Sequence, residues 1–426
     1  MIGKKDAPMP HLDWHTPATG ANWLSLLDAA PESVGIDLPA VRRYRLGRVR
    51  SEMKKAGVAA LILSDPVNIR YATGTRNMQV FCARNTPSRY LLLTEHRSIL
   101  HEFTGCEHLA RGFETVDEVR PAQTASYVAA GPDIAARERK WAREMVDRLR
   151  GLVGKKPVVG LERMNAGVAL EMARMGIQVV DAQEPVELAR SIKSDEEIKC
   201  VMASLHATEI ATGQMRDAIR PGITETELWS ILHQAVIALN GDYVETRLLS
   251  SGERTNPWFQ EAAHKVIGEN ELIGVDTDVV GCHGYYTDFS RTFHSGPDTP
   301  SAEQRELYAI AHEQIHHNID ILKPGLAFRE YAERAWDIPD KYFANRYYLS
   351  AHGVGMTGEY PYLYHRADFP AAGYDGELKP NMTVCVESYI GEEGGREGVK
   401  LEEQLLITET GVERLSTYPY EAELLW

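Results

Sequence analysis

Three aspartates within residues 271–293, a stretch that opens with an apolar run, constrain the fold of this chain more than any other feature. Leu272–Val280 is predicted to be one buried β-strand, and because side chains alternate along a strand, Asp276 and Asp278 point to the same face. A turn and a second short strand bring Asp288 back beside them. Buried carboxylates repel one another unless a positive charge lies between them, and a divalent metal ion supplies that charge. A solvent-exposed edge with scattered acids is the alternative, which the rarity of Asp in apolar strands disfavours.

One histidine and two glutamates extend this pattern further along the chain. His352 precedes a glycine-rich turn in Leu-Ser-Ala-His-Gly-Val-Gly. Glu387 ends an apolar strand predicted at 382–387, and Glu402 lies in another strand, predicted at 398–408. A single acid on an apolar strand carries little information. The order Asp, Asp, His, Glu, Glu, with each acid on a strand of this kind, predicts a metal centre.

These motifs resemble those of the creatinase, prolidase and methionine aminopeptidase group, peptidase family M24, whose catalytic domain has the pita-bread fold. The resemblance rests on VDTDVV, TDFSRTF, SAHGVG, CVES and VKLEEQLLIT. It implies two divalent transition-metal ions with a carboxylate bridging them. The implied metal ligands are Asp278 or Asp276, Asp288, His352, Glu387 and Glu402. Sites of this composition accept iron, manganese, cobalt or zinc, so these residues leave the metal's identity open.

Composition excludes several classes of function. The 426 residues include 46 Lys and Arg against 61 Asp and Glu, a formal net charge of −15 without a long basic run, so nucleic acid is not expected as a partner. No apolar run approaches the roughly 18 residues of a membrane-spanning helix, and the N-terminus lacks the apolar core of a signal peptide. Five dispersed cysteines without Cys-x-x-Cys spacing are typical of reduced thiols. We therefore expect a cytoplasmic protein with no membrane partner.

The first part of the chain alternates strands with helices, which predicts an α/β domain over residues 1–188 that includes an extended arm at 1–35. The predicted helices are 38–56 and 134–152, and the predicted strands are 58–64, 89–93, 98–100, 158–161 and 178–181. The segment DPVNIRYATGT is similar to part of the N-terminal domain of the creatinase and prolidase group. That resemblance implies a homodimer in which this domain lends residues to the partner's site.

The second part of the chain, residues 189–426, opens with helix signals. Ser194 with Glu197 and Thr224 with Glu227 have the spacing of capping boxes, in which each side chain bonds the other residue's backbone N–H. The helices predicted there are 195–219, 225–240 and 302–322. Together with the resemblance, these signals give an α/β (α+β) fold class, with a creatinase-like N-terminal domain followed by a pita-bread metallohydrolase domain.

The chain departs from the peptidases of the family at two positions. The resemblance places two proton-shuttling histidines beside the metals, and their places here fall near Trp258 and at Glu359. His264 is too close to the first aspartate to take the first role. Without these histidines ordinary peptide hydrolysis is not expected. The alternative is that the alignment of this chain with the peptidases is wrong by a few residues.

A second resemblance covers nearly the whole chain. The segments NIRYATGTRNMQVF, VETRLLSSGERTNPWFQE, VDTDVVG, HGVGM, EEGG and VKLEEQLLITE are similar to the M24-type dimethylsulfoniopropionate lyases. It implies cleavage of a sulfonium zwitterion to dimethyl sulfide and acrylate, with two metals, often iron, on the substrate carboxylate and with Asp276 as an additional ligand. In those lyases an aspartate after the HGVG motif is the proposed base, and Gly358 stands in its place here.

Elimination still needs a base within hydrogen-bond reach of the substrate. Tyr347 and Glu359 are the candidates near the motif. For Tyr347, two dications nearby would favour the phenolate form. A sulfonium has no hydrogen to donate and is best held by aromatic faces, for which Trp258, Tyr348 and Tyr360 are predicted. The alternative is that most of these rings are packing residues.

The residues thus support three hypotheses. The first is a dinuclear metalloenzyme that cleaves a small zwitterion. The second is hydrolysis at the same centre, by an Xaa-Pro dipeptidase or an ectoine- or creatine-type C–N hydrolase, with Glu387 or Glu359 moving the proton. The third is a non-enzymatic binding module, which the complete set of expected ligands disfavours. Ser290 and Arg291 are expected to orient Asp288.

Overall fold

The computed structural model describes residues 35–78 and 88–425, which form two compact units, 37–190 and the described part of 191–426. The predicted arm, apart from its last residue, and Cys82 lie outside the described residues. The fold class is confirmed, because each unit combines sheet and helix in the expected way. The domain limits of 1–188 and 189–426 stay a prediction.

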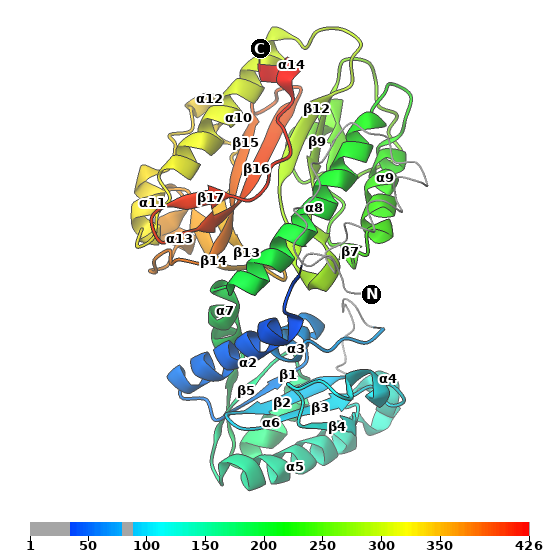
Figure 1. Ribbon diagram of the computed structural model, residues 1–426, viewed down its shortest axis with the longest axis vertical. Coiled ribbons are helices and arrows are strands. Elements are labelled where there is room, and N and C mark those ends of the chain that lie inside the picture. Colours follow the sequence, from blue (N-terminus) through cyan, green and yellow to red (C-terminus); the bar gives the residue numbers. More distant parts are fainter. Residues whose placement is uncertain (1–34, 79–87, 426) are drawn as a thin grey trace. The chain divides into compact units, whose positions relative to one another are not determined.

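The N-terminal unit is built on a six-stranded mixed sheet in the order β4-β3-β2-β1-β5-β6, with helices on both of its faces (Figure 1). Its strands are β1 Ala60–Leu63, β2 Tyr90–Thr94, β3 Ser98–Glu102, β4 Glu118–Pro121, β5 Val158–Leu161 and β6 Gln178–Asp181. Its helices are α2 Leu38–Lys55, α3 Pro66–Thr73, α4 Tyr127–Ala130, α5 Ile134–Val153, α6 Ala166–Arg174 and α7 Gln183–Ser191.

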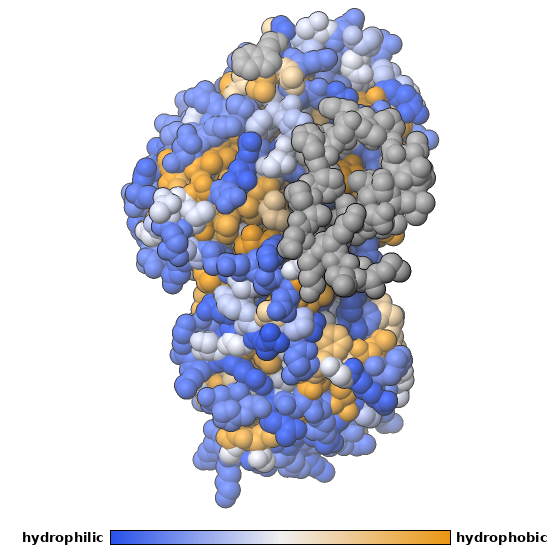
Figure 2. All heavy atoms as spheres, in the orientation of Figure 1, coloured by the Kyte–Doolittle hydropathy of each residue, from blue (hydrophilic) through white to orange (hydrophobic). Residues whose placement is uncertain are grey.

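Helix α5 shows why this unit folds as it does. Trp141, Met145 and Leu149 recur every four residues along α5, so they share one face of the helix. That face is buried against Ile62 and Leu92 of the central strands, in one hydrophobic core. The visible surface of this unit is mostly hydrophilic, with hydrophobic residues gathered near α4 (Figure 2).

The segment after β1 is a helix, which the sequence analysis did not assign. Asp65 accepts a hydrogen bond from the backbone N–H of Val67, and Pro66 occupies the first helical turn. Both features favour a helix start. Gly74, with φ of +77°, ends α3 in the left-handed conformation that glycine adopts most readily.

The C-terminal unit contains three sheets. A five-stranded antiparallel sheet has the order β14-β13-β15-β16-β17, and two three-stranded sheets have the orders β12-β9-β8 and β11-β10-β7. The strands are β7 Tyr243–Val244, β8 Leu249–Ser251, β9 Leu272–Asp276, β10 Val279–Val280, β11 Tyr286–Thr287, β12 Ser290–His294, β13 Leu349–Val354, β14 Gly358–Tyr364, β15 Thr383–Gly391, β16 Gly398–Ile407 and β17 Val412–Arg414. The helices are α8 Asp195–Asp217, α9 Glu225–Ala238, α10 Ala302–Asp320, α11 Phe328–Arg334, α12 Asp340–Phe343, α13 Phe369–Ala372 and α14 Ala422–Leu425.

Both predicted capping boxes are confirmed, at Ser194 for α8 and at Thr224 for α9. A third opens α10 at Ser301. Helix α10 packs along β15 and β16 (Figure 1) and closes a large hydrophobic core of this unit. Among residues 35–78 and 88–425, no helix combines the length and apolar character needed to cross a bilayer.

The single strand predicted at 272–280 is wrong. Strand β9 ends at Asp276, the backbone of Asp278 has a φ of +44°, and β10 then joins a different sheet. An oxygen atom of each of the Asp276 and Asp278 carboxylates and one of Asp288 all lie within 4.8 Å of one another. The chain leaves regular strand geometry at the point where the three acids meet.

Candidate metal centre

All six predicted metal ligands converge in the C-terminal unit. They come from the end of β9, the β9–β10 and β11–β12 connections, and strands β13, β15 and β16, and all are buried: Asp276, Asp278, Asp288, His352, Glu387 and Glu402. Ligand atoms of the three aspartates lie within 4.8 Å of one another. A second group with the same spacing contains Asp288, His352, Cys385 and Glu402. Asp288 belongs to both groups, so it is placed between two potential metal positions.

Strand pairing forces the two glutamates together. Glu387 and Glu402 are direct partners in the β15–β16 register. Like charges placed opposite each other destabilise a sheet. A sequence that keeps two acids at such a pair, fully buried, needs a compensating charge between them.

His352 is oriented as a ligand through one ring nitrogen. Its Nδ1 lies 3.0 Å from the carbonyl oxygen of Gly353, so Nδ1 carries the proton and donates it there. The Nε2 atom then faces the acids, 3.4 Å from Glu387 and 3.5 Å from both Asp288 and Glu402. This arrangement, in which one nitrogen is fixed by a carbonyl and the other is free for a metal, is usual at metal sites.

The pKa values of the acidic side chains reflect the excess of negative charge in the cluster. Burial and the neighbouring carboxylates raise the pKa of Asp288 well above its usual range. Burial and Asp276 raise the pKa of Asp278 to about 8, and burial and Glu387 raise that of Glu402 to about 7. Asp276 is the exception: burial alone would raise its pKa, but Lys400 together with side-chain hydrogen bonds inside the cluster lowers it.

Lys400 is a member of the cluster that the sequence analysis missed. This buried lysine places Nζ 2.5 Å from Glu387, 3.0 Å from Glu402 and 3.3 Å from Asp276. Five carboxylates and one lysine leave a formal charge of −4, which two divalent ions would balance. A basic residue two positions before Glu402, on the same face of an apolar strand, was the available signal.

The unsatisfied atoms of the cluster also fit metal ions. Within the described residues, Oδ1 of Asp288 and Oε1 of Glu402 are buried without a hydrogen-bond partner. Buried polar atoms are nearly always bonded, so an orphaned carboxylate oxygen indicates a ligand. The charge, the orphaned oxygens and the oxygen-rich donor set together fit two divalent metals.

Cys385 was also missed. Its Sγ lies 3.3 Å from the backbone carbonyl oxygen of Asp288, and burial together with Glu402 raises the pKa of the thiol well above its usual range. The thiol therefore stays protonated and donates to that carbonyl.

Ser290 and Arg291 do not hold Asp288, contrary to expectation. Ser290 Oγ lies 2.8 Å from both Asp276 and Glu402, and Arg291 donates to the Glu402 backbone carbonyl. Asp288 is instead tied through its backbone N–H, which donates to Gln404. The strand register explains this, because Ser290 is paired with Asp276 across β12 and β9.

Aromatic rings line one side of the cluster. The Tyr347 ring stacks on Phe259 at 5.3 Å and on Tyr348 at 5.7 Å, and Tyr348 is half exposed. Lys400 Nζ lies 5.2 Å from the centre of the Tyr347 ring and 5.7 Å from that of Trp258. The aromatic stack of Phe259, Tyr347 and Tyr348 therefore connects the carboxylates with the surface, and a cation already lies against one of its rings.

The other predicted contacts are distributed differently. Tyr360 packs on Phe328 and Tyr374, at 6.0 and 5.8 Å, next to the large core. Tyr362, which had not been selected, places its ring 6.3 Å from that of His352. Tyr362 is the pairing partner of His352 across β13 and β14, and a shift in that register next to His352 interrupts the regular alternation that would put Tyr360 on the same face.

The two candidate bases have different surroundings. The Glu359 carboxylate forms a buried ion pair with Lys193 at 2.6 Å. Burial and Glu387 raise the pKa of Tyr347 well above its usual range. The protein's own groups thus oppose ionisation of Tyr347, and the charge of two dications is what the predicted phenolate would require.

Gly358 lies at the start of β14 and is exposed. A Cβ atom added there would meet no other atom within 4 Å. The position can therefore carry a side chain.

Two family models match the chain. The model of metallopeptidase family M24 matches residues 199–409, and the model of the creatinase/prolidase N-terminal domain matches residues 45–192. Together they cover both compact units.

Curated relatives and solved structures agree with these matches. The chain is 35% identical to dimethylsulfoniopropionate lyase DddP of Roseobacter denitrificans, over 91% of this chain and 88% of the lyase. It is 32% identical to the enzyme of the same name from Roseovarius nubinhibens, with the same coverage. The fold is similar to that of a recombinant prolidase from Thermococcus sibiricus, with a TM-score of 0.73, 19% identity and coverage of 89% and 98%.

Proposed function

The chain belongs to metallopeptidase family M24, and from that premise we propose that it cleaves dimethylsulfoniopropionate to dimethyl sulfide and acrylate. The observation that carries the proposal is the identity of 35% to a lyase of that name across nearly the whole chain. The buried acidic cluster and the aromatic stack beside it support a small zwitterion as the substrate.

The proposed ligands of one metal are Asp276, Asp278 and Asp288, and those of the other are Asp288, His352, Glu387 and Glu402. When bound, the two divalent ions would hold the substrate carboxylate and acidify the adjacent C–H bond. We propose iron, with manganese, cobalt or zinc as alternatives that the same donor set accepts.

The sulfonium group is proposed to lie against the aromatic stack. Aromatic faces attract cations that have no hydrogen to donate. The Lys400 ammonium beside the Tyr347 ring is the supporting observation, since it places a cation against an aromatic ring of this site. Trp258 and Tyr348 remain proposed contacts, and Tyr362 joins them because of its position next to His352. Tyr360, with its core contacts, is the weakest of the set.

Tyr347 is the proposed base. It removes the proton next to the carboxylate, the electron pair of that bond forms the C=C bond, and the C–S bond breaks with its electrons leaving on sulfur. Glu359 is the second candidate, but its carboxylate is already engaged in a buried ion pair with Lys193. A positioned base contributes about 100- to 10,000-fold to such a step.

Hydrolysis of a C–N bond at the same centre is the second candidate function. Gly358 favours it, because the resemblance places the aspartate base of the lyases at this position and glycine has no side chain that could take a proton. A dipeptidase activity has less support, since Trp258 and Glu359 stand where the peptidases have histidines.

Purified protein incubated with dimethylsulfoniopropionate tests the proposal, with dimethyl sulfide measured in the headspace. We expect release of dimethyl sulfide that depends on metal, and poor turnover of Ala-Pro and Gly-Pro. Turnover of these dipeptides at about 1–1,000 per second, the usual range for enzymes, without dimethyl sulfide would overturn the lyase in favour of the peptidase.

We further propose a cytoplasmic homodimer without nucleic-acid partners. The net charge of −15 supports this environment, as do Cys106, Cys200, Cys282 and Cys385, which form no disulfide within the described residues. The match to the creatinase/prolidase N-terminal domain supports the dimer. Light scattering of the purified protein tests it, and a monomer at working concentration would contradict it.

A further inference from the structure

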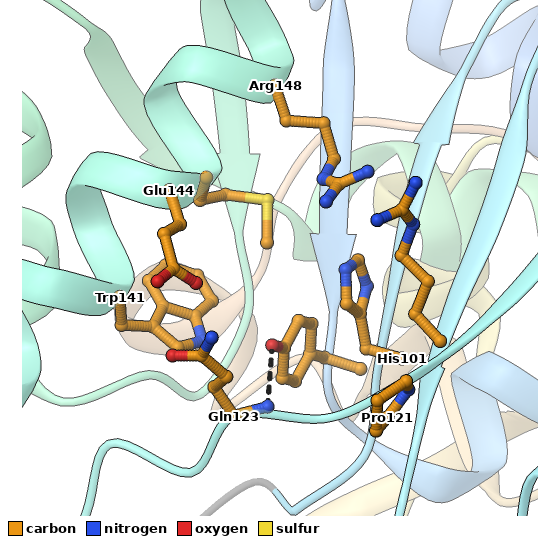
Figure 3. A pocket seen from close by; sticks show the side chains of 9 residues that line it. His101, Pro121, Gln123, Trp141, Glu144 and Arg148 are labelled. Carbon is orange, nitrogen blue, oxygen red and sulfur yellow. Dashed lines mark hydrogen bonds between the residues drawn. The ribbon is translucent and has the colours of Figure 1, made fainter.

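A cavity of about 190 Å³ lies within the N-terminal unit, between α5 and the β2–β3–β4 side of the sheet (Figure 3). Its lining residues are Tyr90, His101, Arg120, Pro121, Gln123, Trp141, Glu144, Met145 and Arg148. Trp141 and Glu144 lie on one side of it and His101 on the other (Figure 3). The cavity is smaller than the roughly 300–1,000 Å³ of pockets for drug-sized ligands, so it suits a molecule of few heavy atoms.

The register of the sheet builds one wall. Tyr90 is paired with His101 across β2 and β3, and His101 is paired with Arg120 across β3 and β4. Partners on neighbouring strands point to the same face, so the three side chains form a row facing α5. The opposite wall is one face of α5, because Trp141, Met145 and Arg148 follow helical spacing.

Charged and polar groups in this cavity lack partners. Within the described residues, Arg148 has no ion-pair partner, and Nδ1 of His101 and Nε of Arg120 are buried without a hydrogen bond. Arg120 does pair with Glu118 through another nitrogen. Glu144, the acid of the lining, lies 3.9 Å from Lys140.

His101 shows the sign of the uncompensated charge. It is 5% exposed and stacks on Tyr90 at 4.5 Å. Burial and the guanidinium groups of Arg148 and Arg120 lower the pKa of His101 to about 3. The ring is therefore neutral and offers one N–H donor, and the guanidinium groups of Arg148 and Arg120 give this end of the cavity a positive charge.

We propose that this cavity binds a small organic carboxylate. The carboxylate accepts hydrogen bonds from Arg148, Arg120 and His101, and a short apolar chain lies against Trp141 and Met145. Arginine pairs with carboxylates through two parallel N–H donors, which suits a planar anion of this size. The apolar wall favours an organic anion over an inorganic one.

Calorimetric titration of the full-length, metal-loaded protein with sodium propionate tests the proposal. Arg148→Met removes the unpaired guanidinium and keeps a side chain of similar length. Arg143→Met is the matched control, since Arg143 is exposed on the same helix. The metal centre is identical in both variants, so propionate bound there contributes equally to both. We expect at least about tenfold weaker binding in Arg148→Met than in Arg143→Met, because a charge-assisted hydrogen bond is lost.

A measurement on the unmodified protein is independent of any folding defect in the variants. At neutral pH, where propionate is an anion, its binding should shift the ring NMR signals of His101, because the bound carboxylate lies against that ring. Inorganic phosphate should bind more weakly than propionate. Equal affinity in the two variants, unmoved ring signals of His101 at neutral pH, or tighter binding of phosphate would each overturn the proposal.

Discussion

The two sites of this chain are electrostatic opposites. In the C-terminal unit five buried carboxylates surround one lysine, whereas in the N-terminal unit two guanidinium groups flank a neutral histidine. The carboxylates are buried, and within the described part of the chain one oxygen atom each of Asp288 and Glu402 has no hydrogen-bond partner. Arg120 and Arg148 are only partly buried, so water can solvate their exposed parts. We infer that the acidic cluster depends on bound cations, and that the basic cavity tolerates being empty.

The backbone also differs between the two sites, being regular at the basic cavity and irregular at the acidic cluster. The basic cavity uses regular strand register and regular helical spacing. The acidic cluster needs a broken strand and a positive φ at Asp278. Strain of this kind costs about 1–3 kcal/mol and persists where the surroundings enforce it. Ligands that hold the three aspartates together would help to enforce it.

Metal removal is expected to have the largest effect. A chelator should abolish activity, and the untreated protein should contain about two transition-metal ions per chain by elemental analysis, matching the formal charge of −4. Glu402→Ala should lower that content, because it removes one of the buried ligands. Glu409→Ala, at a position just beyond the end of β16, is the control. Full metal occupancy in Glu402→Ala would contradict the ligand assignment.

Tyr347→Phe is expected to have the second-largest effect. The variant keeps the ring that contacts Phe259 and Tyr348 but removes the hydroxyl. Substrate affinity should therefore persist while kcat falls about 100-fold or more, the usual share of a general base. Tyr348→Phe, the same change on the neighbouring half-exposed ring, should leave kcat unchanged. A fully active Tyr347→Phe would remove Tyr347 from the mechanism.

Gly358→Asp should have a smaller effect and an opposite direction. The open space around this residue accommodates the new side chain. If the centre acts on dimethylsulfoniopropionate, a carboxylate at this position adds a base and should raise dimethyl sulfide release, by about tenfold where Tyr347 already supplies part of that role. Gly358→Ala separates the effect of the carboxylate from that of restricting the backbone. An inert Gly358→Asp together with an active Tyr347→Phe would favour the hydrolase.

The sequence predicted which residues meet in the acidic cluster better than it predicted the backbone and the neighbouring side chains around them. His352, Glu387 and Glu402 could be found because their strands are apolar, so an acid or histidine there stands out. The break at Asp278 could not, since strand alternation assumes a regular backbone. Lys400 was missed because its importance depends on Glu387, which lies on the neighbouring strand.

The basic cavity illustrates a different limit. Nothing near His101 in the sequence indicates Arg120 as its neighbour, because β3 and β4 pair in parallel across a connection. The position of Arg148 depends in addition on which face of α5 meets the sheet. Short local patterns predict elements and caps, as at Ser194, but not the register between elements.

The smallest expected effect is on stability, and its sign differs between the two sites. In the metal-free protein Glu402 and Asp278 keep their protons to pKa values of about 7 and about 8, whereas in the unfolded chain they lose them near pH 4. Between these values the folded state binds more protons, so its stability falls as pH rises. His101 acts oppositely, because its folded pKa of about 3 lies below the unfolded value of about 6.5, and stability is lost as pH falls through that interval.

Scanning calorimetry can separate these two contributions. The metal-free protein should have a lower Tm at pH 8 than at pH 5, by roughly 2–4 °C for each kcal/mol, and bound metal should suppress the difference because it replaces the protons. His101→Gln should gain stability relative to the unmodified protein as pH falls from 6.5 to 4, since glutamine has no proton to bind in the unfolded chain. A metal-free protein equally stable at pH 5 and pH 8 would show that the carboxylates are not under the strain that their burial implies. An acid response unchanged by His101→Gln would show that burial and the two guanidinium groups do not hold His101 neutral.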